Sequence, residues 1–191
     1  DRSSAASDVY KRQDKGEVSQ ECVKKFVQYY IDKGVQGIYV NGSSGECIYQ
    51  SVEDRKKIIE AVMQVARGRL TVINHVACNN TKDSIELAKH SEKVGVDAIA
   101  AIPPIYFKLP EYSIAAYWNA MSDAAPNTDF IIYNIPQLAG VALTDSLYAT
   151  MRQNPRVIGV KNSSMLCKIF RCLSQLVVMI TLSSMVQMSS S

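Results

Sequence analysis

The sequence predicts an α/β fold in which helices cover a parallel sheet, and three observations predict it. Amphipathic helical stretches alternate with short β-rich runs between positions 18 and 161. Five of these β-rich runs recur about every 27 to 34 residues, which is the length of one strand-and-helix repeat. The 191 residues, 47% of them hydrophobic, suffice for one sizeable core but not for two. We therefore expect one domain, or part of a larger one.

The first two predicted helices cover residues 23–33 and 51–67, where apolar side chains recur at helical spacing. Gly34 and Gly68 end them, since glycine readily adopts the left-handed conformation found at helix ends. Residues 51–54 form a capping signal that begins the second helix. The strands that follow these helices are predicted at 37–40 and 71–73.

The third predicted helix, at 81–94, ends at Gly95 and leads into a strand at 98–102. Pro103 and Pro104 end this strand, because proline donates no ladder hydrogen bond. The remaining helices are predicted at 111–124 and 145–153, and the remaining strands at 130–134 and 157–161. The repeat alone fits both a closed barrel and an open doubly wound sheet. No Gly-x-Gly-x-x-Gly or phosphate-binding loop follows any predicted strand, which weakens nucleotide-binding versions of the open sheet.

Charge and cysteine content argue against several functional classes. A net charge of +3 is too small to suggest binding to nucleic acid or to a membrane surface. The apolar runs are short, and the first residues form no signal-peptide core, so we expect a cytoplasmic protein. The five cysteines form no Cys-x-x-Cys pair, and His75 and His90 lack metal-ligand spacing, so we expect neither a disulfide framework nor a metal site.

Polar groups follow three of the predicted strands, at the end where parallel α/β barrels carry their active sites. Lys161 follows an apolar strand, and burial there would lower its pKa and make the amine nucleophilic, although a lone strand-end lysine is more often ordinary. Tyr133 could relay a proton, but a core aromatic is the commoner reading. Residues 42–46, Gly-Ser-Ser-Gly-Glu, could bind a carboxylate or form a plain turn.

Taken together, these motifs resemble the pyruvate-dependent class I aldolases of the N-acetylneuraminate lyase and dihydrodipicolinate synthase family. The resemblance covers about residues 14–165 and depends on three ordered motifs, at 42–46, 133–136 and 159–164. It implies a partial TIM (β/α)8 barrel of about five or six βα units that lacks the first and last strands. It implies no metal and no organic cofactor.

The resemblance also implies roles for individual residues. Lys161 would form a Schiff base with pyruvate, and Tyr133 would move the proton at the carbon–carbon bond being broken. Ser43 and Ser44 would hold the pyruvyl carboxylate. Ser163 would contact the sugar portion of the substrate.

Two further features concern the substrate and the assembly. Residues 137–139 favour the lyase branch, because synthases usually carry an arginine there, and the loop at 42–45 also looks more like the lyase version. The resemblance thus implies cleavage of sialic acid to N-acetylmannosamine and pyruvate, by a homotetramer when full length. Tyr106, in a Pro-x-Tyr segment, would line the pocket or a subunit contact. A dihydrodipicolinate synthase-like aldolase and a non-catalytic fragment stay open as alternatives.

Both ends of the chain depart from the family pattern. We expect residues 1–13 to be a non-native leader, 14–165 the partial barrel and 166–191 a frame-shifted tail. Two segments typical of the family's continuation, when written with plausible codons and read one base later, would give the residues found at 176–180 and 184–188. A barrel without its outer strands has open sheet edges and an unfilled interior, so we expect weak activity or none.

Overall fold

A computed structural model describes residues 18–163 of the chain. The leader expected at residues 1–13 and the shifted tail expected at 166–191 lie outside the described residues. The described part falls into two compact units. The first unit comprises residues 18–75 and 90–97, and the second comprises 76–89 and 98–163.

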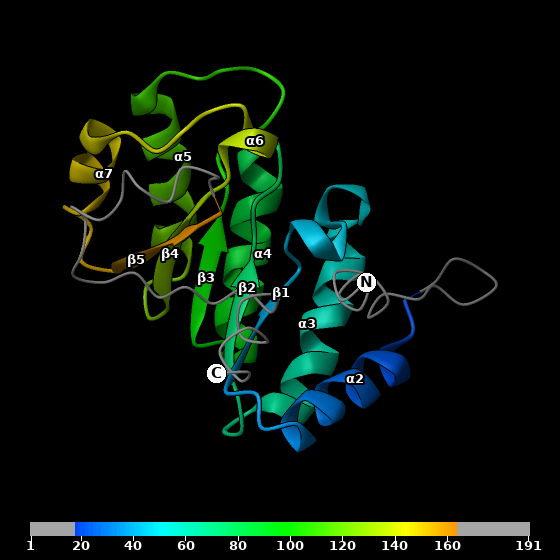
Figure 1. The fold of residues 1–191 in the computed structure, drawn as a ribbon. Coiled ribbons are helices and arrows are strands. Elements are labelled where there is room, and N and C mark those ends of the chain that lie inside the picture. The colour runs from blue at the N-terminus through cyan, green and yellow to red at the C-terminus, as the bar shows by residue number, and fades with distance from the viewer. Residues whose placement is uncertain (1–17, 164–191) are drawn as a thin grey trace, which may run out of the picture. The chain divides into compact units, whose positions relative to one another are not determined.

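The first unit pairs two parallel strands and packs two helices together (Figure 1). Its elements are α2 (Gln20–Asp32), β1 (Gly37–Val40), the short 3-10 helices η2 (Ser43–Gly45) and η3 (Cys47–Tyr49), α3 (Val52–Ala66) and β2 (Thr71–His75). The Ser19 hydroxyl accepts a hydrogen bond from the Cys22 amide at the start of α2, and Ser51 does the same for Asp54 at the start of α3. These caps satisfy amides that the first helical turn leaves without partners.

The second unit is built on three parallel strands, with β4 between β3 and β5. Its elements are β3 (Ala98–Ala101), α5 (Glu111–Ala124), β4 (Asp129–Asn134), α6 (Pro136–Ala139), α7 (Asp145–Met151) and β5 (Val157–Asn162). The register between β4 and β5 shifts by a bulge between Phe130 and Ile131. Helix α4 (Thr81–Val94) has residues in both units.

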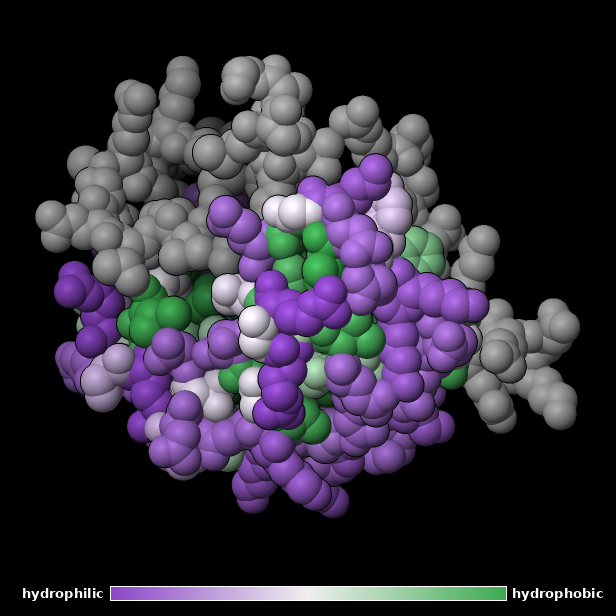
Figure 2. Space-filling view, turned by 90° about the horizontal axis from the view of Figure 1, so that it is seen from below, coloured by the Kyte–Doolittle hydropathy of each residue, from purple (hydrophilic) through white to green (hydrophobic). Residues whose placement is uncertain are grey.

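The core of each unit consists of apolar side chains from strands and helices. In the first unit Ile58, Ile59 and Val72 are fully buried, and in the second Trp118 and Phe130 are buried to the same extent. Hydrophilic side chains dominate the face of the described residues seen in Figure 2, with hydrophobic ones between them. None of the helices between residues 18 and 163 combines the length and the apolar character that crossing a membrane requires.

The predicted α/β fold with parallel strands is confirmed, and each predicted helix and strand is present at close to its expected bounds. The structure adds η2, η3 and α6. These segments are one turn long, too short to show the apolar periodicity on which sequence prediction depends.

Candidate active site

Lys161 lies in β5, and its side chain is buried, with only 3% of the residue exposed. Burial lowers the pKa of its amine from the usual 10.5 to about 7, because the charged form loses its hydration inside the protein. Near neutral pH a large fraction of this amine is therefore unprotonated. The unprotonated amine is the form that attacks carbonyl carbons.

Tyr133 is the direct register partner of Lys161 across the parallel pair of β4 and β5. Partners in neighbouring strands point to the same face of a sheet, so the two side chains meet. The Lys161 Nζ atom lies 3.3 Å from the centroid of the Tyr133 ring, which is itself buried. The sheet register thus sets the amine against a phenol ring.

Ser163 follows the end of β5 and completes a group of three. The Lys161 amine donates a hydrogen bond of 3.1 Å to the Ser163 Oγ atom. The main-chain amide of Ser163 donates to the carbonyl of Asn134, at 2.9 Å. Three of the six residues selected from the sequence therefore come together within the second unit.

Ser43 and Ser44 lie in the first unit, in the turn that follows β1. Ser43 is half-buried and Ser44 is exposed. The turn is tight: the amides of Gly45 and Cys47 donate to the Gly42 carbonyl, and Glu46 has a left-handed φ of 54°. The turn thus presents two serine hydroxyls next to a strand end.

Buried polar side chains anchor the start of this turn. Asn41, itself left-handed with φ of 56°, donates through its side-chain amide to Asn74 Oδ1 at 2.9 Å and to the Arg55 carbonyl at 3.2 Å. His75 Nδ1 lies 3.0 Å from the Asn41 carbonyl, and the Arg55 guanidinium donates to the His75 carbonyl. His75 therefore has a structural role in the first unit.

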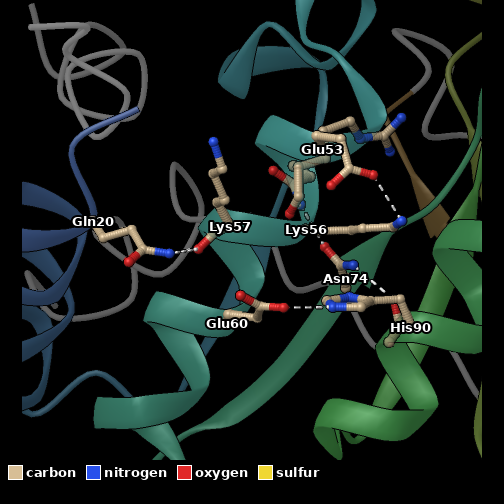
Figure 3. Close-up of polar contacts among 10 residues, drawn as sticks. Gln20, Glu53, Lys56, Lys57, Glu60, Asn74 and His90 are labelled. Atoms are coloured by element: carbon tan, nitrogen blue, oxygen red, sulfur yellow. Dashed lines mark hydrogen bonds and ion pairs between the residues drawn. The ribbon is translucent and has the colours of Figure 1, made fainter. Parts of the chain in front are cut away.

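His90 also makes a structural contact in the first unit. Its Nε2 atom lies 2.8 Å from Oε1 of Glu60 in α3. Figure 3 marks this contact with a dashed line. No three His, Cys, Asp or Glu side chains among residues 18–163 are grouped in a way that could hold a metal ion.

Tyr106 lies on the surface of the second unit. Its side chain is 88% exposed, and its ring packs edge-on against Phe107, which is 73% exposed. Its φ of 85° lies in a region that non-glycine residues rarely adopt. Both roles expected for Tyr106, in the pocket wall and in a subunit contact, stay predictions.

Sequence reasoning misses Asn134, the last residue of β4. It is 3% exposed, and its side-chain amide donates to Asn162 and accepts from the Leu143 amide, both at 3.0 Å. The signal available in the sequence is a polar residue directly after Tyr133, at the end of an apolar strand.

Comparison with known proteins identifies relatives of this chain. The model of the dihydrodipicolinate synthetase family matches residues 6–179. The N-acetylneuraminate lyase of Mediterraneibacter gnavus is 73% identical over 150 residues, which make up 78% of this chain and 48% of the lyase. The chain spans about half the length of the curated relatives it matches.

Solved structures give the same result. The wild-type Ruminococcus gnavus sialic acid aldolase aligns with a TM-score of 0.79 and 72% identity, over 80% of this chain and 51% of the aldolase. A catalytic lysine mutant of that aldolase aligns with a TM-score of 0.83 and 66% identity, over 87% of this chain and 55% of the mutant. The resemblance found in the sequence motifs is thereby confirmed. The chain belongs to the dihydrodipicolinate synthetase family.

Proposed function

We propose that this chain carries the Schiff-base centre of an N-acetylneuraminate lyase, a carbon–carbon lyase that splits sialic acid into N-acetylmannosamine and pyruvate. The observation that carries the proposal is the buried amine of Lys161 against the ring of Tyr133. The 73% identity to an N-acetylneuraminate lyase supports this substrate. A solved relative described as a catalytic lysine mutant supports a lysine as the reacting group.

In the proposed reaction the unprotonated Lys161 amine attacks the ketone carbonyl of the substrate. The addition product takes up one proton and loses water, so the amine, the ketone and the proton become an iminium and one water molecule. The positive iminium then accepts the electron pair of the breaking carbon–carbon bond. Tyr133 takes the proton from the hydroxyl group that becomes the aldehyde, and a proton returned to the resulting enamine leads to pyruvate after hydrolysis.

The remaining residues have binding roles in this proposal. Ser43 and Ser44 hold the pyruvyl carboxylate, and the tight turn that presents their hydroxyls supports this role. Ser163 contacts the sugar portion of the substrate, and its hydrogen bond with Lys161 supports a place beside the reacting amine. Tyr106 contributes to a subunit contact. The full-length protein is proposed to be a cytoplasmic homotetramer that uses no metal or organic cofactor.

Borohydride trapping tests the proposal on this chain. We expect borohydride to reduce the imine formed with pyruvate into a stable adduct, which mass spectrometry of peptides locates at Lys161. A matched control is the exposed Lys108: Lys108→Met should keep the adduct and Lys161→Met should lose it. A folded wild-type chain that forms no adduct would contradict the proposal and favour an inert fragment.

Turnover assays identify the branch of the family. Release of pyruvate from sialic acid supports the lyase. Consumption of pyruvate with aspartate semialdehyde, without cleavage of sialic acid, would instead indicate a synthase.

A further inference from the structure

We propose that Asn134 is a positioning residue that holds Lys161, Tyr133 and Ser163 in their mutual arrangement. The inference rests on the proposed function, because it assigns Asn134 a part in preparing the Schiff-base lysine. Asn134 acts through other residues and does not touch the reacting atoms.

The contacts of Asn134 connect three separate segments of the second unit. Its side-chain Nδ2 donates to Asn162 Oδ1 on β5, at 3.0 Å. Its Oδ1 accepts from the main-chain amide of Leu143, in the loop before α7, at 3.0 Å. Its carbonyl accepts from the amide of Ser163, at 2.9 Å. One buried residue therefore ties the end of β4 to β5, to a loop and to the serine beside the amine.

The position of these contacts in the strand pair explains why they matter. Asn134 and Asn162 are register partners directly after the pair Tyr133 and Lys161. Side chains alternate along a strand, so the two asparagines lie on the face of the sheet opposite to the amine. Their hydrogen bond therefore holds β4 and β5 in register from the face of the sheet opposite to the Lys161 amine.

The irregular register between β4 and β5 gives such a bond importance, because Ile158 of β5 is passed over in the pairing. The register between β4 and β5 changes between Phe130 and Ile131, so pairing at the start of the strands does not determine pairing at their ends. A slip of one residue would turn Lys161 to the other face of the sheet. The hydrogen bond between Asn134 and Asn162 lies directly beside the register pair Tyr133 and Lys161, which must stay aligned.

The same bonds keep the amine buried. Two groups that contact Lys161 Nζ are the Tyr133 ring on β4 and the Ser163 hydroxyl after β5. Burial is the cause of the lowered pKa of this amine. Loosening the strand ends admits water and returns the pKa of Lys161 toward its ordinary value.

The test compares Asn134→Ala and Asn162→Ala with a matched control, Asn119→Ala. Asn119 accepts a hydrogen bond of 2.9 Å from the side chain of Asn154, which precedes the start of β5. The control therefore removes the same type of amide bond in the same unit, at the opposite end of the strand. Urea unfolding first establishes that each variant is folded.

Two measurements are then made on the folded proteins. Competitive acylation with trace acetic anhydride gives the pH midpoint at which Lys161 becomes reactive, without any substrate. Borohydride trapping gives the rate of adduct formation with pyruvate. For Asn134→Ala we expect the midpoint to rise by about one pH unit or more and the trapping rate at neutral pH to fall about tenfold or more. Asn162→Ala should shift both in the same direction, and Asn119→Ala should lower stability but shift neither.

The outcomes separate this inference from the proposed function. A wild-type midpoint and trapping rate in the folded Asn134→Ala and Asn162→Ala proteins would overturn the inference and leave the proposed function intact. A wild-type chain that forms no pyruvate adduct would overturn the proposed function, while the acylation midpoint still decides whether Asn134 positions the amine. If Asn134→Ala does not fold, Asn162→Ala alone decides between these outcomes, because Asn162 is only partly buried.

Discussion

Replacing Lys161 with methionine should stabilise the chain, and the gain should be largest at low pH. Burial lowers the pKa of the amine from 10.5 to about 7. The shift of about 3.5 units corresponds to about 5 kcal/mol at about 1.4 kcal/mol per unit, as an upper bound on the cost of burying the charged amine. Methionine has a similar volume and no charge, so it removes this cost.

The sign of the pH dependence follows from counting protons. Between pH 7 and pH 10.5 the unfolded chain keeps the Lys161 proton that the folded chain has lost, so wild-type stability rises with pH across this window. The linkage relation gives a rise of about 2 kcal/mol between pH 7 and pH 9. Attraction between the ammonium and the Tyr133 ring, worth about 1 to 2 kcal/mol, is too weak to reverse the sign.

The assay is urea unfolding at about pH 6, 7 and 9, carried out on the wild type, Lys161→Met and Lys108→Met. We expect the free energy of unfolding to rise equally with pH in the wild type and in the exposed control Lys108→Met. In Lys161→Met the rise between pH 7 and 9 that comes from the Lys161 amine should be absent. Equal slopes for all three proteins would refute the reasoning, because the amine would then titrate alike in the folded and unfolded states.

Three further predictions concern the strand ends. Tyr133→Phe keeps the ring against Lys161, so borohydride should still trap the pyruvate adduct, while cleavage of sialic acid should fall about 100-fold or more; unchanged cleavage would exclude Tyr133 as the proton carrier. A Cβ atom at Gly42 would lie 2.7 Å from the Tyr39 ring. Gly42→Ala should therefore lower the free energy of unfolding, measured by urea titration, by about 1 to 3 kcal/mol. An unchanged free energy of unfolding would mean that the ring moves freely. Asn41→Ala should lower the free energy of unfolding by about 2 to 4 kcal/mol, because it loses two buried hydrogen bonds and keeps the left-handed backbone. Asn41→Gly relieves only the backbone, so it should recover part of this loss. Full recovery in Asn41→Gly would show that the two hydrogen bonds contribute little.

Local patterns in the sequence determine the elements of this protein. Ser51 caps α3 and glycines follow several of the helices, because these signals act within a few residues. The order of the three motifs also identifies the family correctly, and it selects Lys161, whose role as the Schiff-base lysine stays a prediction. The same motifs select Ser43 and Ser44, whose carboxylate-binding role stays a prediction.

Only the tertiary structure decided the state and surroundings of the amine. Lys161 and Tyr133 are 28 residues apart in the sequence, and the register of two strands, with a bulge between them, sets them face to face. The hydrogen bond between Asn134 and Asn162 depends on the same pairing, and the exposure of Tyr106 depends on how its segment packs. Burial and side-chain contact arise from segments distant along the chain, so no local pattern encodes them, and the lowered pKa of the lysine follows from that burial.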